Sequence, residues 1–406
     1  MRASYFDHNA TTPLHPEVRE AMLRWLGEGP GAGAGAGSSA RWGNPSSIHR
    51  FGQAAREAVE SAREQVARLI DCRTPEELVF VASGTEGNNA VVASALGAAV
   101  PGERLVVSRL EHPSVVASAH AWAPRAGVEI VEVAPDAEGV VSAGRLDEAA
   151  TAGTCLVALM LANNEIGTIQ PVEELAGALR ARGVPLLCDA VQAVGKIPVS
   201  VQRLGVDYLT IAAHKFHGPL GAAALWIRGG APFSPLMVGG AQERRRRAAT
   251  VNVPAVVGFG AACAVAGREL GERQDHLRFL RDRFEAGLTA IPDARVHGTL
   301  APRLPHTTHV AFPGTVGQEL MIRLDLAGFA ISTGAACGSG TVQASPTLFA
   351  MGMAPAEAIA SIRVSFGMPN TSDEIDAFLP VLAEAVAALR GATVGAVRAP
   401  SRDGRP

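Results

Sequence analysis

A lysine stands between an apolar run and a Gly-Pro turn in residues 210–219, which read TIAAHKFHGP. At the end of a strand and inside a cleft, Lys215 would be partly desolvated, which lowers the pKa of its amine and makes it a Schiff-base nucleophile. A solvated surface lysine is the alternative for this residue taken alone. The polar residues at the ends of other predicted strands help to distinguish a Schiff-base lysine from a surface lysine.

A carboxylate ends a second apolar run, in residues 186–192, which read LLCDAVQ. Asp189 can hold the nitrogen of a pyridine ring protonated, so that the ring withdraws electrons from a bound substrate. Gln192 follows three residues later. Taken alone, Asp189 can equally be the cap of the next helix.

Two further segments place polar groups after apolar runs. Residues 82–89, ASGTEGNN, offer the backbone amides around Gly84 and the Thr85 hydroxyl to an anion at a helix N-terminus. In residues 109–114, RLEHPS, the imidazole of His112 can stack on a flat ring and exchange protons. The alternatives are an ordinary N-cap with a tight glycine turn for the first segment and a structural histidine for the second.

Short β-branched runs alternate with helix-like stretches through the first 260 residues, which is typical of parallel strands joined by crossover helices. Ligands of such α/β sheets bind at the carboxyl ends of the strands, where these polar residues are expected. The predicted strands are 78–81, 105–107, 130–133, 155–161, 186–188 and 208–211, and the predicted helices are 46–69, 257–288 and 373–389. A second, smaller α+β domain is expected after about residue 260.

The composition is that of a globular enzyme subunit. The chain has 406 residues, 48% of them hydrophobic and 18% charged, and a net charge of -3, which argues against broad disorder and against nucleic acid as a direct partner. We expect the basic run at 244–247 to be a solvated loop, some of whose charges pair with acidic groups across a dimer. No leader, membrane span, disulfide framework or metal site is expected, because there is no long apolar stretch and the five cysteines are scattered; a cytoplasmic location fits.

Several of these segments resemble, in order and spacing, the cysteine desulfurases of the NifS/IscS-like branch of the class V, fold-type I aminotransferases. Besides the segments above, the resemblance rests on residues 6–13 (FDHNATTP), 43–49 (GNPSSIH), 163–170 (NNEIGTIQ), 331–340 (ISTGAACGSG) and 363–367 (RVSFG). It covers nearly the whole chain. It implies an enzyme that uses pyridoxal 5'-phosphate (PLP) to take sulfur from L-cysteine, which releases alanine.

The resemblance also implies roles for individual residues. Lys215 would form the Schiff base with PLP and move protons at the substrate carbon. The other implied roles are Asp189 at the pyridine nitrogen, Gln192 at the ring hydroxyl, His112 on the ring face, Asn164 beside cofactor and substrate, Gly84, Thr85 and His214 at the phosphate, and Thr250 reaching the phosphate of a partner subunit. A homodimer is therefore expected.

Two residues separate a desulfurase from an ordinary aminotransferase in this resemblance. Cys337, in a glycine-rich loop, would be the thiolate that takes the sulfur as a persulfide and passes it to an acceptor protein or thiol. Arg363 would clamp the substrate carboxylate, for which a planar guanidinium is suited. Taken alone, Arg363 can also be a surface ion pair, and the other four cysteines are expected to be small buried hydrophobes.

The implied fold has two domains. Residues 16–260 form a large domain with a mostly parallel seven-stranded sheet between helices. Residues 1–15 and 261–390 form a smaller α+β domain that carries the cysteine loop. The glycine-rich and alanine-rich residues 31–37 are expected to be a mobile spacer, and residues 391–406 a flexible tail.

The chain departs from the family pattern at two positions near the expected phosphate site. Ala212 stands where serine is common, which removes one hydrogen bond, and Ala249 replaces a usual glycine beside Thr250. Other class V reactions, such as that of a selenocysteine lyase, and a non-catalytic sulfur-relay protein are the alternative functions. Cys337 argues against the first, and the intact Lys215 and Asp189 argue against the second.

Overall fold

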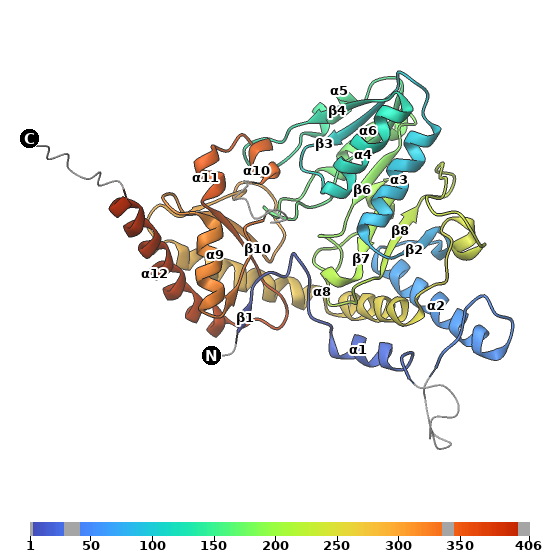
Figure 1. Cartoon of the computed structure of the whole chain (residues 1–406). Coiled ribbons are helices and arrows are strands. Elements are labelled where there is room, and N and C mark those ends of the chain that lie inside the picture. Colours follow the sequence, from blue (N-terminus) through green and yellow to red (C-terminus); the bar gives the residue numbers. More distant parts are fainter. Residues whose placement is uncertain (1–2, 28–40, 335–344, 397–406) are drawn as a thin grey trace, which may run out of the picture.

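The computed structural model describes residues 3–27, 41–334 and 345–396 (Figure 1). Cys337, the spacer at 31–37 and the end of the predicted tail lie outside these residues. The strands are β1 (Ser4–Tyr5), β2 (Leu78–Val81), β3 (Arg104–Ser108), β4 (Glu129–Val133), β5 (Thr154–Ala158), β6 (Leu186–Asp189), β7 (Tyr208–Ala212), β8 (Ala223–Ile227), β9 (Arg295–Val296), β10 (Thr307–Ala311), β11 (Phe329–Ala330) and β12 (Ser361–Ser365). The α-helices are α1 (Pro16–Leu23), α2 (Arg50–Leu69), α3 (Gly84–Ala98), α4 (Pro113–Ala126), α5 (Ala143–Ala149), α6 (Val172–Ala181), α7 (Val201–Leu204), α8 (Val253–Leu288), α9 (Gly317–Leu326), α10 (Pro346–Ala350), α11 (Pro355–Ile359) and α12 (Ser372–Ala396).

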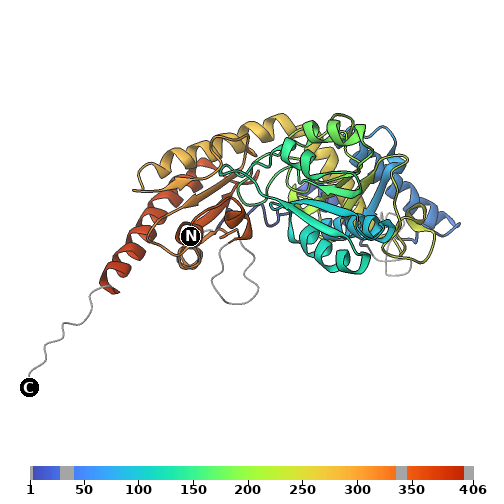
Figure 2. The same ribbon diagram turned by 90° about the horizontal axis from the view of Figure 1, so that it is seen from above.

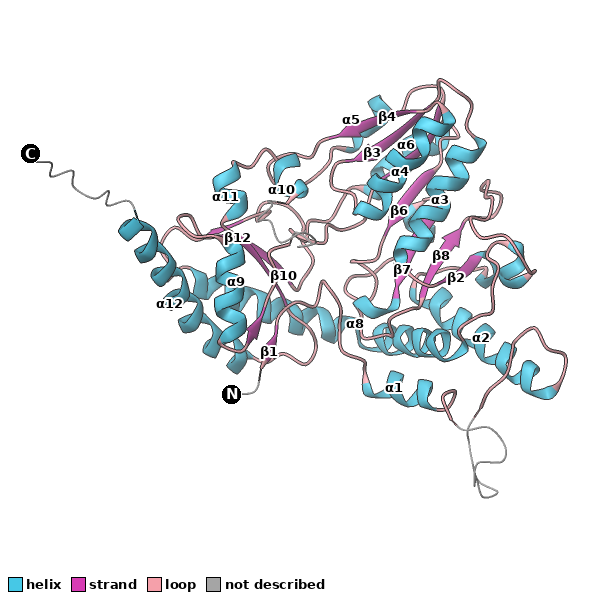
Figure 3. Ribbon diagram, in the orientation of Figure 1, coloured by secondary structure: helices cyan, strands magenta, loops and turns pink. Residues whose placement is uncertain are grey.

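Seven strands form the central sheet in the order β2-β8-β7-β6-β5-β3-β4 (Figure 3). The pairs from β7 to β4 are parallel, and β8 runs antiparallel to both of its neighbours. The predicted α/β fold with a mostly parallel seven-stranded sheet is thus confirmed. Crossover helices between the parallel strands bring the carboxyl ends of β3, β5, β6 and β7 to one edge of the sheet.

Helices cover both faces of this sheet. Successive residues of a strand point to opposite faces, so in β3 Val106 packs in one hydrophobic cluster while Leu105 and Val107 pack in the other. Residues of α3 and α4 complete the cluster that contains Leu105, and residues of α2, α6 and α8 complete the cluster that contains Val106. Both faces are apolar, as expected for a buried parallel sheet.

A second group of elements encloses its own core. It contains the antiparallel sheet β12-β10-β9, the parallel pair β1-β11, and helices α9 and α12. Helix α8 joins the two parts, because its residues as far as Ala266 pack in the first core and those from Leu277 onward in the second. The predicted domain boundary at residue 260 therefore falls inside one continuous helix (Figure 2).

Helix α8 is, by length and composition, the one helix in the described part of the chain that could cross a membrane. Of its most apolar window, 56% is buried against the rest of the protein. Both of its halves contribute to hydrophobic cores. We read α8 as a core helix.

The N-terminal segment passes between the two parts. Strand β1 pairs with β11, and Asp7 forms a bridge with Ser365 at the end of β12. The chain then reaches the large sheet, where the Thr12 amide and hydroxyl both donate to the carbonyl of His214. Residues 7–12 therefore lie over the carboxyl end of β7, beside Lys215.

Candidate active site

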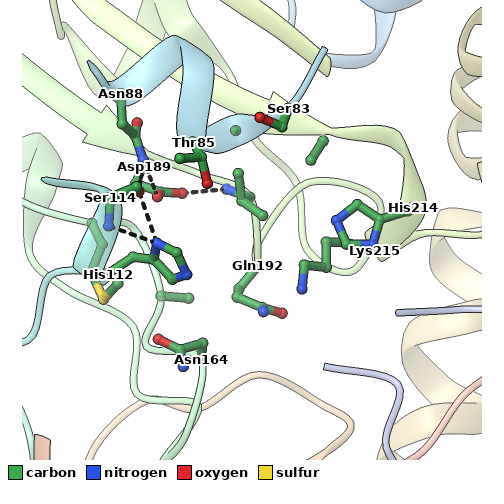
Figure 4. Close-up of a pocket in the computed structure, with 15 residues that line it drawn as sticks. Ser83, Thr85, Asn88, His112, Ser114, Asn164, Asp189, Gln192, His214 and Lys215 are labelled. Atoms are coloured by element: carbon green, nitrogen blue, oxygen red, sulfur yellow. Dashed lines mark hydrogen bonds between the residues drawn. The ribbon is translucent and has the colours of Figure 1, made fainter. Parts of the chain in front are cut away.

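A cavity of about 250 Å³ opens at the carboxyl ends of β5, β6 and β7 and at the N-terminus of α3 (Figure 4). Its lining includes eight of the residues predicted from the sequence: Gly84, Thr85, His112, Asn164, Asp189, Gln192, His214 and Lys215. They come from five separate loops that follow strands. The structure thus brings together side chains that are up to about 130 residues apart in the sequence.

Asp189 lies at one end of the cavity and is held on both carboxylate oxygens. Its Oδ1 accepts from the amide of Val191 at 2.9 Å, and its Oδ2 accepts from Nδ2 of Asn88 at 2.7 Å. These two hydrogen bonds fix the plane of the carboxylate. Each oxygen keeps a lone pair for a ligand, so Asp189 can hold a protonated ring nitrogen.

A chain of hydrogen bonds connects Asp189 to His112 (Figure 4). Besides Asp189, Asn88 Nδ2 donates to the Ser114 hydroxyl at 2.9 Å. That oxygen lies 2.8 Å from Nδ1 of His112, which also accepts from the Ser114 amide at 3.1 Å. Because an amide can only donate, Nδ1 carries no proton, and the Ser114 hydroxyl hydrogen is directed at it.

The protonation state of His112 follows from these contacts. Burial is the main cause that lowers the pKa of His112, with nearby Lys215 acting in the same direction and Asp189 opposing both. A neutral imidazole whose Nδ1 accepts two hydrogen bonds must carry its proton on Nε2. His112 is therefore a donor at Nε2.

Among the described residues, the amine of Lys215 has no carboxylate partner. Its Nζ donates to the carbonyls of Asn9 at 2.7 Å and Ala10 at 2.8 Å. Burial and the positive charge of Arg363 lower the pKa of Lys215 to about 8, although Asp189 and Asp7 oppose the shift. A substantial fraction of this amine is thus neutral and nucleophilic near physiological pH.

The N-terminal segment supplies further contacts that the sequence analysis did not assign. The Asn9 carbonyl that binds Lys215 also accepts from Gln192 Nε2 at 3.0 Å. The Thr11 hydroxyl lies 3.1 Å from Nδ1 of His214, whose pKa is lowered to about 4, chiefly by burial. Residues 9–11 therefore orient three of the predicted site residues.

The first turn of α3 forms the other end of the cavity. The Ser83 hydroxyl accepts from the Glu86 amide at 3.1 Å, and Glu86 accepts from the Ala82 amide at 2.8 Å, a pattern close to a capping box. The N-cap interpretation is thus correct, and it is compatible with anion binding because Gly84 and Thr85 still line the cavity. A side chain at Gly84 would meet Val191 at 2.9 Å.

Arg363 lies beside the site rather than in the lining of the cavity. It is buried on β12, where it donates to Asp7 Oδ1 at 2.6 Å and to the Asn164 carbonyl at 3.0 Å. Its Nε is buried and has no hydrogen-bond partner in the part of the chain that the structure describes. The interpretation of Arg363 as a surface ion pair is therefore wrong, since the pair with Asp7 is buried next to the site.

Thr250 is exposed and does not line this cavity, which agrees with a role outside its own subunit but does not test it. Ala249, which replaces a usual glycine, has a positive φ of 89°. Ala212 lines the cavity without a hydroxyl to offer. In the basic run, Arg244 pairs with Glu60 and Arg247 with Glu86, both within the same chain.

Cys337 lies outside the described residues, so its position remains a prediction. The other four cysteines are free, and three of them are buried. Burial raises the pKa of Cys188 and Cys263 well above the usual value and that of Cys155 to about 11. Such thiols are poor nucleophiles, as expected for small buried hydrophobes.

The chain is similar to known proteins over almost its whole length. A family model described as aminotransferase class V matches residues 4–378. A cysteine desulfurase of Cereibacter sphaeroides is 40% identical over 391 residues, which cover 96% of this chain and 97% of the relative. Cysteine desulfurase IscS of Dictyoglomus turgidum is 39% identical over 391 residues, which cover 96% of each chain. A solved structure of a NifS-like protein has a TM-score of 0.85 and 34% identity, and the match covers 96% of this chain and 100% of that chain.

The chain belongs to the class V aminotransferase family, whose model spans almost all of it. Its relatives and structural neighbours place it within that family in the NifS/IscS-like cysteine desulfurase branch. The family predicted from the sequence motifs is thus confirmed.

Proposed function

We propose that this enzyme removes sulfur from L-cysteine with PLP bound in the cavity at Lys215, and that Cys337 receives the sulfur. The observation that carries the proposal is that a lysine amine, a fixed carboxylate and a helix N-terminus face the same cavity. The cysteine desulfurase names of the relatives support the choice of substrate.

The residues of the cavity fit PLP at three separate points. The carboxylate of Asp189 suits a protonated pyridine nitrogen, and the partly desolvated amine of Lys215 suits the aldehyde. The first turn of α3, with Gly84 and Thr85, suits the phosphate, since backbone amides and the helix dipole both favour an anion. When bound, PLP supplies an electron sink for the bonds at the substrate α-carbon.

Individual side chains of the protein would transfer the proton, contact the cofactor ring and bind the substrate carboxylate. Lys215 holds or takes the proton at the substrate α-carbon, because its lowered pKa lets it act in both directions near neutral pH. His112, which carries its proton on Nε2, would lie on the face of the ring. Arg363, with Asn164 beside it, would bind the substrate carboxylate, for which a planar guanidinium is suited.

The sulfur transfer is assigned to Cys337. Its thiolate would attack the sulfur of the bound cysteine, forming an S–S bond while the C–S bond breaks. The electron pair of the broken bond stays on the carbon, which takes up a proton and so becomes the methyl group of alanine. The persulfide on Cys337 then passes its outer sulfur to an acceptor protein or thiol.

The assembly and location are part of the proposal. We infer a homodimer in which Thr250 of each subunit reaches the phosphate of the other, in keeping with its exposure and its absence from its own cavity. We also infer a cytoplasmic enzyme, where a reducing environment keeps Cys337 as a thiol.

The variant Cys337→Ala tests the proposal. It should keep the yellow absorbance of bound PLP near about 400 nm. It should form alanine and sulfide from L-cysteine at a rate reduced on the order of a hundredfold or more, because the nucleophile is lost. The matched control, Cys155→Ala, removes a thiol remote from the cavity and should leave turnover unchanged. Unchanged turnover in Cys337→Ala would remove this residue from the mechanism, and a colourless wild type that cannot be reconstituted would refute the use of PLP.

A further inference from the structure

The chain contains only two lysines, Lys196 and Lys215, and every other residue counted among its 36 lysines and arginines is an arginine. Both lysines lie at the same place in the fold. They line a small cavity of about 20 Å³ behind the active site, together with Thr12, Phe216 and His306. All other lysine-or-arginine positions of the chain are arginine. We therefore infer that position 196 requires a property of lysine that arginine lacks.

Lys196 is buried and its amine contacts one side chain. It is 4% exposed, and its Nζ donates to Oε1 of Gln192 at 2.9 Å. The ionisable groups that act on it, Lys215 and Arg363, are basic, and with burial as the largest cause they lower the pKa of Lys196 well below the usual value. Burying such an amine without a carboxylate partner costs stability, so a purely structural role explains it poorly.

The turn that carries Lys196 is built to place it there. Gly195 has a φ of +78°, and a Cβ on it would lie 2.6 Å from Cβ of Phe216, the residue after Lys215. The Lys196 amide donates to the Ala193 carbonyl and closes the turn. A larger residue at 195 would push the lysine away from Gln192.

The contacts of Gln192 determine the orientation of its side-chain amide, with Nε2 toward Asn9 and Oε1 toward Lys196. The Asn9 carbonyl can only accept, so the group 3.0 Å from it must be Nε2. Lys196 then meets Oε1. One hydrogen of Nε2 is used by Asn9, and the other is available to the cavity that Gln192 lines.

We propose that Lys196 is a positioning residue that holds the Gln192 oxygen away from the cavity and so presents the Gln192 N–H as a hydrogen-bond donor to the ring hydroxyl oxygen of the cofactor. This inference rests on the proposed function, since it concerns PLP in the same cavity. Lys196 touches neither cofactor nor substrate and acts only through Gln192. Its hydrogen bond also polarises the amide, which strengthens the N–H as a donor.

The test is a pH titration of the visible absorption band of bound PLP in wild type and in Lys196→Met. A donor on the ring oxygen stabilises its negative charge. Without that donor, the charge acts more strongly on the neighbouring cofactor nitrogen, which then keeps its proton to higher pH. We expect the titration midpoint to rise by roughly half to one pH unit in Lys196→Met, the size of one neutral hydrogen bond.

The variant Gln192→Ala and the double variant with Lys196→Met test whether Lys196 acts on the cofactor through Gln192. In Gln192→Ala the midpoint should already be raised, and adding Lys196→Met should shift it no further, because the two residues act as one unit. An equal shift from Lys196→Met in both backgrounds would overturn the proposal, since it would mean that the lysine charge acts on the cofactor directly. No shift in the wild-type background would overturn it as well.

Lys196→Gln covers the case in which the methionine variant does not fold. Its amide is polar but one atom too short to reach Gln192, so its midpoint should rise as in Lys196→Met, and a midpoint equal to that of the wild type would refute the proposal. The wild type distinguishes the two levels of inference. A wild type that binds no PLP refutes the proposed function, whereas a wild type that titrates normally beside unshifted variants refutes only the role of Lys196.

Discussion

The residues around the Lys215 amine determine the pH range in which it is neutral and can react. Two backbone carbonyls, of Asn9 and Ala10, are its hydrogen-bond partners, and neither carries a charge that would hold the ammonium form. Burial and Arg363 then lower the pKa of this amine to about 8. The neutral fraction increases as pH rises through that value, whereas an ordinary lysine would remain charged until about two units higher.

Acylation of the apoprotein tests this prediction. The reactivity of Lys215 toward an amine-acylating reagent should increase tenfold per pH unit below about 8 and level off above it, because only the neutral amine reacts. Mass spectrometry of the peptide gives the extent of reaction, and Lys196, the one other lysine, is a buried control. Reactivity that still climbs tenfold between pH 9 and about 10 would contradict the lowered pKa.

At the residue scale, the sequence predicted the groups that follow strands and missed those that support them. Lys215, Asp189 and His112 stand out because a polar residue directly after an apolar strand must lie at the binding edge of the sheet. Asn88 contacts Asp189 across 101 positions, and Asn9 contacts Gln192 across 183. Asn88 lies in helix α3, just after residues 83–86, whose pattern is explained by helix capping alone. Nothing in the local sequence therefore indicated that Asn88 contacts Asp189.

At the scale of elements, the loop that leads to Thr250 contains a left-handed turn. Glu243, Arg244 and Arg245 have consecutive positive φ values of 46°, 55° and 64°. Residues with a Cβ adopt this conformation at a cost of about 1–2 kcal/mol each, so other contacts must offset it. Glu243 provides them, since its two oxygens each accept from Arg63 at 2.9 Å and one also accepts from the Phe80 amide at 2.8 Å.

Removal of the partner of Glu243 should therefore unfold this loop first. Arg63→Leu leaves a buried carboxylate unpaired and should lower the free energy of unfolding by about 3–5 kcal/mol. The control Arg68→Leu removes an exposed arginine of the same helix, paired with Glu64, and should cost less than about 1 kcal/mol. Urea unfolding of the two apoproteins at equal concentration measures the difference. Equal midpoints would show that the pair of Arg63 and Glu243 is not needed.

Elements with clear hydropathy patterns were predicted to within a few residues, but one strand of the central sheet and all five strands outside it were not predicted. The predicted strand at 78–81 has the bounds of β2, and the predicted helix at 46–69 begins instead at Arg50, because His49 caps it. Strand β8 was not predicted because Ala223 and Ala224 have a low preference for strands. It also runs antiparallel to its neighbours, so it does not follow the alternation of strands and helices. Helix α12 continues to Ala396, into the segment expected to be a tail.

At the scale of the whole molecule, the proposed dimer makes a prediction about mixed subunits. A subunit with Lys215→Ala still offers Thr250 to its partner, and a subunit with Thr250→Ala still offers Lys215. A hybrid of the two has one site with both residues intact. Unfolding and refolding an equal mixture should therefore restore about a quarter of the wild-type activity above the sum of the parents. Activity equal to the average of the two parents would contradict a shared site.

The position of residues 7–12 has a consequence for how the protein acquires its activity. Asp7 and Asn9 bind Arg363 and Ser365, which lie 356 positions later in the chain and are therefore translated after them. Lys215 and Gln192 can be translated and packed long before those anchors exist. The active site should therefore be complete only after residues 363–365 have been translated and can bind residues 7–9.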